Sequence, residues 1–457
     1  MLHEAFIERM KNLVGEEFSE LEKALSLPAV KGIRINRIKA SPEHFREIFD
    51  ADLSPISYIE TGFIPDIQSG LGQLPEHHAG MFYSQDPGAM AAISAIDISE
   101  GEYVLDACAA PGGKSSHVAE RIGESGFLLA NEYVPKRAKI IVGNFERLGI
   151  KNAIVTSLDT LEISQMFSRF FDTVICDAPC SGEGMFRKYD AAITEWSPEN
   201  VRECAERQLT ILTNCAKTVK YGGQLLYSTC TYSVEENECV IDAFLDSHPD
   251  FYIAPLCDEI ISITASGIIP EGSTREELSL TRRFYPHKSP GEGQYIALLK
   301  RKEGCGEPSV LYRDGAKEIS RQESEIVKSF LNENMKSVPA GRLISQGNGV
   351  ALASDKLPIP PHSVFMPGIM LGEIRGKNFF PHHQLFTALG MNMKRIENLR
   401  KGDPRVEKYL SGEEIDAKSS SGSGFVAVAY EGAVIGGGKL SSGKIKNHYP
   451  KGLRKHT

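Results

Sequence analysis

The residues with the clearest chemistry stand directly after short apolar runs that we expect to be buried strands. Acidic side chains occupy four of these positions: Asp106, Glu132, Asp159 and Asp177. Two cysteines occupy the same kind of position, Cys180 after the fourth run and Cys230 after the fifth. Because the carboxyl ends of parallel strands share one edge of a sheet, and ligands bind at that edge, we expect these side chains to gather around one site.

The loop after the first run suggests what this site binds. It carries paired glycines, Gly112 and Gly113, followed by Lys114, and glycine lets a backbone approach a ligand closely. The loop is neither a Gly-x-Gly-x-x-Gly dinucleotide motif nor a phosphate-binding loop. Four carboxylates would also repel a pyrophosphate. A positively charged nucleoside fits better, and S-adenosylmethionine has that chemistry.

Two of the carboxylates would each contact a defined part of this nucleoside. Glu132 follows Asp106 by 26 residues, the arrangement in which dinucleotide-binding folds accept ribose hydroxyls. Asp159 is placed to accept an adenine amine. A single carboxylate at such a position is more often a helix N-cap, but that explanation is weak for four carboxylates at one edge.

The two edge cysteines differ from the remaining ones, most of which we expect to be small core residues. Cys180 follows Asp-Ala-Pro and precedes Ser-Gly-Glu-Gly. Cys230 precedes Ser233, Glu235 and Glu236, which resemble the start of a helix. Because a helix N-terminus lowers the pKa of a nearby thiol, both positions suit a reactive cysteine.

These residues need a doubly wound, mainly parallel α/β sheet to bring them together. Strands are expected at 103–105, 127–130, 153–155, 173–176 and 224–227, and helices at 112–121, 135–148, 198–219 and 234–245. This alternation is typical of βαβ units. Two later runs, 283–285 and 295–299, are expected to pair as an antiparallel hairpin.

The remaining chain suggests further domains. Residues 1–75 combine a helical pattern at 2–26 with a short strand at 32–36, and predict a small N-terminal α/β domain. The catalytic domain is expected at 76–302, a linker and intermediate module at 303–375, and a β-containing module at 376–457. A hairpin is expected across 424–435.

Composition limits the class of protein. The 457 residues carry a net charge of −9, which argues against nucleic-acid binding by bulk charge. Basic clusters at 31–39, 282–288 and 432–457 still favour a polyanionic partner. No apolar run is long enough for a membrane helix, and no signal peptide is recognisable. Nine cysteines without metal-binding spacing predict a reduced cytoplasmic protein without a metal site.

Three long motifs carry a family resemblance. Residues 106–114 read DACAAPGGK, residues 177–184 read DAPCSGEG, and residues 227–238 read YSTCTYSVEENE. Their order and spacing resemble RNA cytosine 5-methyltransferases of the RsmB/RsmF (Sun) class. The segments at 1–75 and 446–454 resemble the RsmF subgroup. The resemblance implies an RNA-binding leader domain at 1–75 and a PUA-like RNA-binding module at 376–457.

The resemblance implies roles for individual residues. Cys230 would be the nucleophile, Cys180 would release the product, Asp177 would orient the base, and Lys114 would assist. The S-adenosylmethionine site would be formed by Cys108, Ala109, Ala110, Pro111, Gly112, Gly113, Lys114, Glu132, Arg137, Asp159 and Asp177. Two departures stand out: residues 85–90 read QDPGAM where the family has a Ser-Ser-Met segment, and the only tryptophan, Trp196, lies outside the C-terminal module.

The resemblance favours small-subunit ribosomal RNA as the substrate of a monomeric enzyme. Transfer RNA remains an alternative, as does an inactive RNA-binding ribosome assembly factor. A DNA cytosine methyltransferase would use the Pro-Cys cysteine, Cys180, as nucleophile, and the second cysteine argues against it. An amino-group methyltransferase would need an aromatic residue where Cys180 stands.

Overall fold

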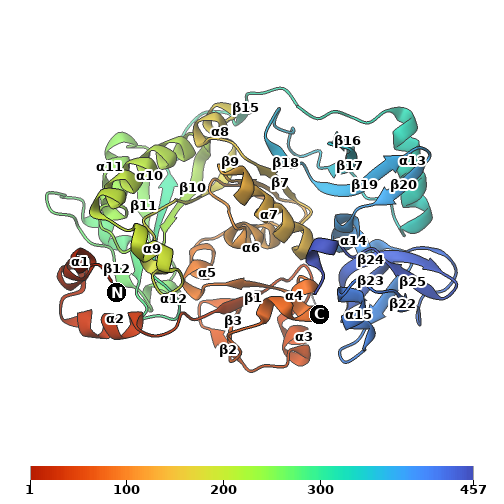
Figure 1. Ribbon diagram of the computed structural model, residues 1–457. Coiled ribbons are helices and arrows are strands. Elements are labelled where there is room, and N and C mark those ends of the chain that lie inside the picture. Colours follow the sequence, from red (N-terminus) through yellow and green to blue (C-terminus); the bar gives the residue numbers. More distant parts are fainter. Residues whose placement is uncertain (1, 456–457) are drawn as a thin grey trace.

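The computed structural model describes residues 2–455, and a single large sheet forms its centre (Figure 1). Five parallel strands lie in the spatial order β10-β9-β5-β6-β7. Their bounds are β5 Tyr103–Asp106, β6 Phe127–Asn131, β7 Ala153–Thr156, β9 Phe171–Asp177 and β10 Val219–Thr229. The predicted α/β class is confirmed, because these strands contain all five predicted runs.

Antiparallel strands extend the sheet at both edges. Beside β10 come β14 (Gln294–Arg301), β13 (Arg282–Phe284) and β12 (Ala265–Ser266), while β11 (Phe251–Ala254) also pairs with β14. The predicted pairing of the runs at 283–285 and 295–299 is therefore confirmed. At the other edge, β18 (Val364–Met366) pairs with β7, so a strand from far along the chain completes the sheet.

Helices cover both faces of the sheet. On one face pack α5 (Pro87–Ser94), α6 (Gly113–Arg121) and α7 (Pro135–Leu148). On the other face pack α8 (Thr160–Met166), α10 (Pro198–Thr218) and α11 (Glu238–Ser247). The helix predicted from residue 234 begins only at Glu238, because residues 234–237 form a turn.

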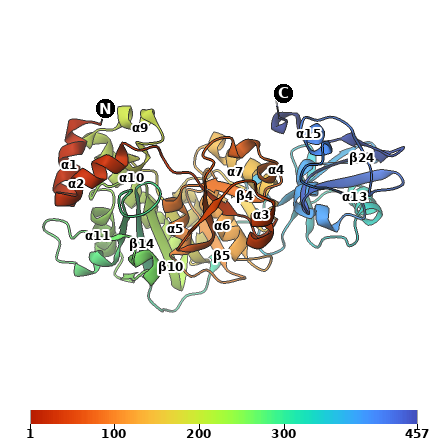
Figure 2. The ribbon, with the colours of Figure 1, turned by 90° about the horizontal axis from the view of Figure 1, so that it is seen from below.

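The N-terminal segment divides into two parts. The pattern at 2–26 forms two helices, α1 (Glu4–Val14) and α2 (Phe18–Leu25), because Gly15 has a positive φ of 55° and ends the first. These helices lie beside α9 (Asp190–Glu195) of the central domain (Figures 1 and 2).

The chain after α2 forms a separate sheet in the order β2-β3-β1-β4. Its elements are β1 Gly32–Ile35, α3 Pro42–Ile48, β2 Leu53–Ile56, β3 Ile59–Pro65, α4 Pro75–His78 and β4 Phe82–Gln85. The fourth strand lies beyond residue 75, the predicted end of the N-terminal domain.

Two small sheets form the C-terminal part, which Figure 2 shows as a lobe beside α3 and α4. The first has the order β16-β17-β19-β20, with α13 (Arg321–Asn334) packed on it. Its strands are β16 Arg342–Gln346, β17 Gly349–Ala353, β19 Ile369–Arg375 and β20 Asn378–Pro381. A division at residue 375 stays a prediction, and the hairpin β19–β20 crosses that point.

The second sheet has the order β21-β23-β24-β25-β22 and packs against the N-terminal sheet. Its strands are β21 Ile396–Leu399, β22 Ile415–Asp416, β23 Gly424–Tyr430, β24 Ala433–Ser441 and β25 Lys444–Asn447. The antiparallel pairing of β23 with β24 confirms the hairpin predicted across 424–435. The helices α14 (His383–Leu389) and α15 (Arg405–Leu410) complete this part.

Several residues of the first two basic clusters are structural, which corrects their reading as surface charges, whereas Lys31, Arg37 and Lys288 are exposed. Arg34 is 1% exposed and pairs with Glu120, and Lys39 donates to backbone carbonyls of the C-terminal part. Arg283 is also buried. In the third cluster, most of the lysines and arginines of residues 432–455 remain exposed.

No helix among residues 2–455 has the length and apolar character to cross a membrane.

The Arg34–Glu120 pair joins the N-terminal sheet to α6 and should stabilise the whole chain. Its Nη1–Oε2 distance is 3.1 Å, and Arg34 also donates to Ser116. Arg34→Leu would leave Glu120 buried without its cation, so we expect the free energy of unfolding to fall by about 3 kcal/mol or more. Chemical denaturation measures this change.

Arg37→Leu is the matched control. Arg37 pairs with Glu60, but both side chains are well exposed, so its loss should cost less than about 1 kcal/mol. Equal effects of the two substitutions would contradict the structural role of the buried pair.

Candidate functional site

A cavity of about 1150 Å³ opens at the carboxyl ends of the parallel strands. Its walls come from the segments that follow β5, β6, β7, β9 and β10, which is the edge where the sequence places the functional residues. Every predicted cofactor or catalytic residue lines it except Gly112. The volume is sufficient for an adenosyl compound together with a second planar group.

The loop between β5 and α6 forms one wall of the cavity. Gly112 has a φ of 105°, a conformation that favours glycine, and it directly precedes the first turn of α6. Asp106, at the end of β5, accepts a hydrogen bond from Ser115 Oγ at 2.5 Å. Its other oxygen, Oδ1, is buried without a hydrogen-bond partner among residues 2–455. Burial raises the pKa of Asp106 to about 7.

Glu132 and Asp159 behave differently from one another. Glu132 is 3% exposed, accepts from the Val134 backbone N–H at 3.0 Å and pairs with Arg137 at 3.1 Å. Asp159 is exposed and caps α8 in a capping box with Glu162. The helix-cap explanation therefore holds for Asp159, although the residue still borders the cavity.

Lys114 is not a surface lysine. Its side chain is buried, and its Nζ lies 2.7 Å from Asp177 Oδ2. The other oxygen of Asp177 accepts from Ser228 Oγ at 2.7 Å. Asp177 is thus held at both oxygens, with its side chain still 30% exposed toward the cavity.

The two edge cysteines come together as free thiols. Cys180 Sγ and Cys230 Sγ are 3.2 Å apart, and both residues line the cavity. The hydrogen bond with Cys230, together with burial, raises the pKa of the Cys180 thiol well above its ordinary value. The expectation that a helix N-terminus lowers the pKa of both thiols is wrong for Cys180. The argument from a helix N-terminus does not apply to Cys230 either, because α11 begins eight residues after it.

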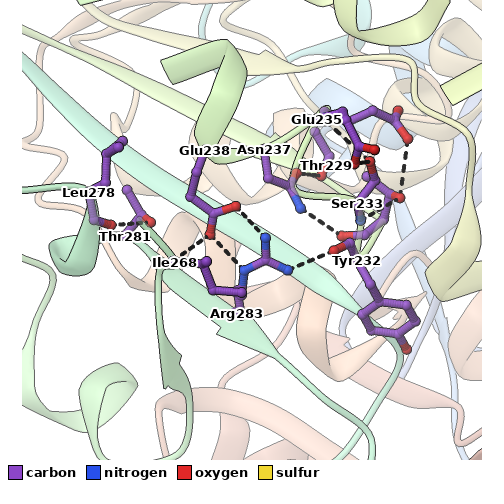
Figure 3. Close-up of polar contacts among 12 residues, drawn as sticks. Thr229, Tyr232, Ser233, Glu235, Asn237, Glu238, Ile268, Leu278, Thr281 and Arg283 are labelled. Carbon is purple, nitrogen blue, oxygen red and sulfur yellow. Dashed lines mark hydrogen bonds and ion pairs between the residues drawn. The ribbon is translucent and has the colours of Figure 1, made fainter. Parts of the chain in front are cut away.

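Instead of a helix N-terminus, a polar network fixes the segment after Cys230 (Figure 3). Thr229 donates to Asn237, whose side chain donates to the Thr231 carbonyl. Arg283 reaches over from β13, pairs with buried Glu238 and donates to the Tyr232 carbonyl at 2.7 Å. The sequence did not reveal this role for Arg283, because arginine spacing alone does not distinguish a buried partner from a surface charge.

The segment at 85–90 that departs from the family pattern is also structural. Asp86 caps α5 by accepting from the Ala89 backbone N–H at 3.2 Å. It accepts from the Glu292 backbone N–H as well, and it pairs with Lys188 at 3.0 Å. Asp86 thus joins three loops at the rim of the cavity.

Three family models match parts of the chain. Residues 93–300 match the family model of the 16S rRNA methyltransferase RsmB/F, residues 2–87 that of the N-terminal domain of RsmF, and residues 397–455 that of the RsmF PUA domain. The chain is 31% identical to ribosomal RNA small subunit methyltransferase F of Vibrio vulnificus, over 99% of this chain and 97% of the relative. The corresponding protein of Vibrio campbellii is 30% identical over 98% and 97%.

The chain belongs to the ribosomal RNA small subunit methyltransferase F family. A solved methyltransferase homolog from Pyrococcus horikoshii is 28% identical, with a TM-score of 0.58 over 65% of this chain and 95% of that one. NSun6 from the same organism, solved with SFG, has a TM-score of 0.58 at 21% identity, over 66% and 99%, and shares the fold.

Methyltransferases of this family depend on S-adenosylmethionine, and the cavity fits that group. Six carboxylates line it against four lysine and arginine side chains, and this excess of negative charge suits a ligand with a positive sulfonium and a positive ammonium. The unpartnered Oδ1 of Asp106 is a buried acceptor without a donor among the described residues. Asp106, Glu132 and Asp159 are the residues that would hold the cofactor by charge and hydrogen bonding.

The raised pKa of Asp106 predicts how cofactor affinity changes with pH. A cation binds the ionised carboxylate, and protonation removes that attraction as the pH falls through about 7. We expect S-adenosylmethionine to bind about tenfold more weakly at pH 6 than at pH 8. Isothermal titration calorimetry measures both affinities.

Asp106→Asn is the control for this prediction. It cannot ionise, so any pH dependence that remains belongs to the amino group of the ligand. An identical pH dependence in the two proteins would contradict the assignment to Asp106.

Proposed function

We propose that this protein methylates carbon 5 of cytosine in small-subunit ribosomal RNA through a covalent adduct with Cys230. The observation that carries this proposal is the pair of thiols 3.2 Å apart beside the carboxylate-lined cavity. One thiol is enough to form a covalent adduct. A second thiol at the same place suits an enzyme that must also release the adduct.

The chemistry requires a nucleophile because carbon 5 of cytosine is not reactive enough by itself. The Cys230 thiolate would add to carbon 6, which breaks the aromaticity of the ring and makes carbon 5 a nucleophile. S-adenosylmethionine supplies a methyl group on a positively charged sulfur, which is left as a neutral thioether when carbon 5 takes that methyl group. Loss of the carbon 5 proton to a base and cleavage of the bond between the Cys230 sulfur and carbon 6 would then restore the aromatic base and the thiolate. Such covalent catalysis replaces one difficult step with two easier ones.

The division of labour between the thiols follows the family resemblance, which assigns attack to Cys230 and release to Cys180. The two sulfur atoms are close enough for both to act on one base. The alternative in which the Pro-Cys cysteine attacks, as in DNA cytosine methyltransferases, leaves no role for a second thiol at this place.

Asp177 and Lys114 are suited to hold the base. With its carboxylate fixed by Lys114 and Ser228, Asp177 would orient the edge of the cytosine near ring nitrogen 3 and stabilise charge as the adduct forms. The reacting carbons of a stacked, paired base are not accessible, so the target must be single-stranded or unstacked. The exposed lysines of the C-terminal PUA domain would bind the RNA backbone.

Cys230→Ala tests the nucleophile. Without the thiolate, methyl transfer should fall more than about 1,000-fold, while S-adenosylmethionine affinity stays nearly unchanged. Bisulfite sequencing of ribosomal and transfer RNA, from cells lacking the gene and complemented with either form, would locate the modified cytosine. A cytosine that stays protected with the variant would contradict the proposed nucleophile.

Cys180→Ala tests product release. The variant should accumulate covalently bound RNA, which appears on a denaturing gel as a slowly migrating band that nuclease removes. Cys257→Ala, at an exposed cysteine outside the cavity, is the control and should give no such band. Ordinary turnover without an adduct in Cys180→Ala would exclude the release role.

A further inference from the structure

Each of the two cysteine-bearing segments contributes one buried glutamate that holds the other segment. Glu183 follows Cys180 by three residues, and Glu236 follows Cys230 by six. Glu183 is 1% exposed and Glu236 is fully buried. The mechanism proposed above uses neither of them.

Glu236 holds the residue next to Cys180. Its Oε2 accepts from the Ser181 backbone N–H at 2.9 Å and from Gln208 Nε2 at 2.8 Å. Its Oε1 accepts from the Ser181 hydroxyl. Gln208 also donates to the carbonyl of Pro179, so the residues on both sides of Cys180 are tied to this one carboxylate and its partner.

Glu183 holds the residues after Cys230 in the same way. Its Oε2 accepts from the Thr231 hydroxyl and from the Tyr232 backbone N–H, both at 2.9 Å, and its Oε1 accepts from Trp196 Nε1. The Thr231 oxygen also lies 3.0 Å from Ser181 Oγ and 3.3 Å from Glu236 Oε1. A backbone hydrogen bond from Gly184 to the Cys230 carbonyl joins the segments once more.

Burying these two carboxylates is costly. Neither forms an ion pair among residues 2–455, and burial raises the pKa of both. A buried carboxylate without a cation needs hydrogen bonds from every side to be tolerated. Such expensive polar groups are typical of places where a protein fixes a functional geometry.

We propose that Glu183 and Glu236 are positioning residues that together hold the Cys180 and Cys230 thiols at the separation needed for both to act on one base. We call them the reciprocal carboxylate pair. The proposal rests on the proposed function for its purpose, but the geometry that it claims can be measured without RNA. It extends the two-thiol site to residues that contact neither base nor cofactor.

Four variants test the pair. Glu236→Ala removes the acceptor of Ser181 and Gln208. Glu236→Gln keeps a carbonyl oxygen for those donors and offers its amide to the Ser181 hydroxyl, so it should restore the geometry without the charge. Thr231→Val removes only the hydroxyl between the two carboxylates and serves if Glu236→Ala binds no S-adenosylmethionine. Glu235→Ala changes the neighbouring residue, which instead pairs with Arg9, and is the control.

The first measurement is the rate at which Cys180 and Cys230 form a disulfide with diamide. The azo group of diamide takes two protons and two electrons from the two thiols and becomes a hydrazine, and peptide mass spectrometry identifies the linked pair. Because the bond requires close sulfurs, Glu236→Ala and Thr231→Val should slow it about tenfold or more. Glu236→Gln and Glu235→Ala should react at nearly the wild-type rate. A wild-type rate in both Glu236→Ala and Thr231→Val would overturn the proposal.

The second measurement is methyl transfer to small-subunit ribosomal RNA from cells lacking the gene. Glu236→Ala should lower kcat by about 100-fold through misplacement of the thiols, with S-adenosylmethionine affinity unchanged and activity largely restored in Glu236→Gln. If wild-type protein transfers no methyl group while the disulfide rates follow the expected order, the proposed function fails and the positioning role stands. If wild type is active and Glu236→Ala is equally active, the positioning role fails alone.

Discussion

The parallel pairing of β9 with β10 is the constraint on which the site depends. Its register sets Asp177 opposite Ser228, so the two strands deliver their following loops to the same place. The bond from Ser228 to Asp177 and the contact between the two thiols both follow from that alignment. A slip of one residue would turn alternate side chains to the other face of the sheet and would separate the groups that the chemistry needs together.

Much of this arrangement could be predicted from the sequence, for a physical reason. Strands buried on both faces read as continuous apolar runs, and the residues that end them meet at one edge. This was enough to place Asp106, Glu132, Asp177 and both cysteines around one cavity. The family motifs then supplied the roles, which neither composition nor spacing supplies.

The residues that sequence reasoning misplaced are those whose partners lie far along the chain. Arg34 and Arg283 were expected to be exposed cations. Arg34 instead pairs with Glu120, 86 residues away, and Arg283 pairs with Glu238, 45 residues away. Glu235 and Glu236 looked like part of a helix start, but α11 begins at Glu238. One of these neighbours pairs with Arg9, and the other is fully buried. A local sequence pattern does not show which distant residue a charged side chain will pair with.

The strand β18 completes the catalytic sheet late in the synthesis of the chain. It comes from residues 364–366, yet it pairs with β7 and covers that edge of the catalytic sheet. An uncovered edge presents unpaired backbone groups to any other strand. During translation, the sheet would therefore keep one open side until residue 366 had left the ribosome. The RNA-binding module at residues 397–455 would leave the ribosome only after the strand that covers this edge.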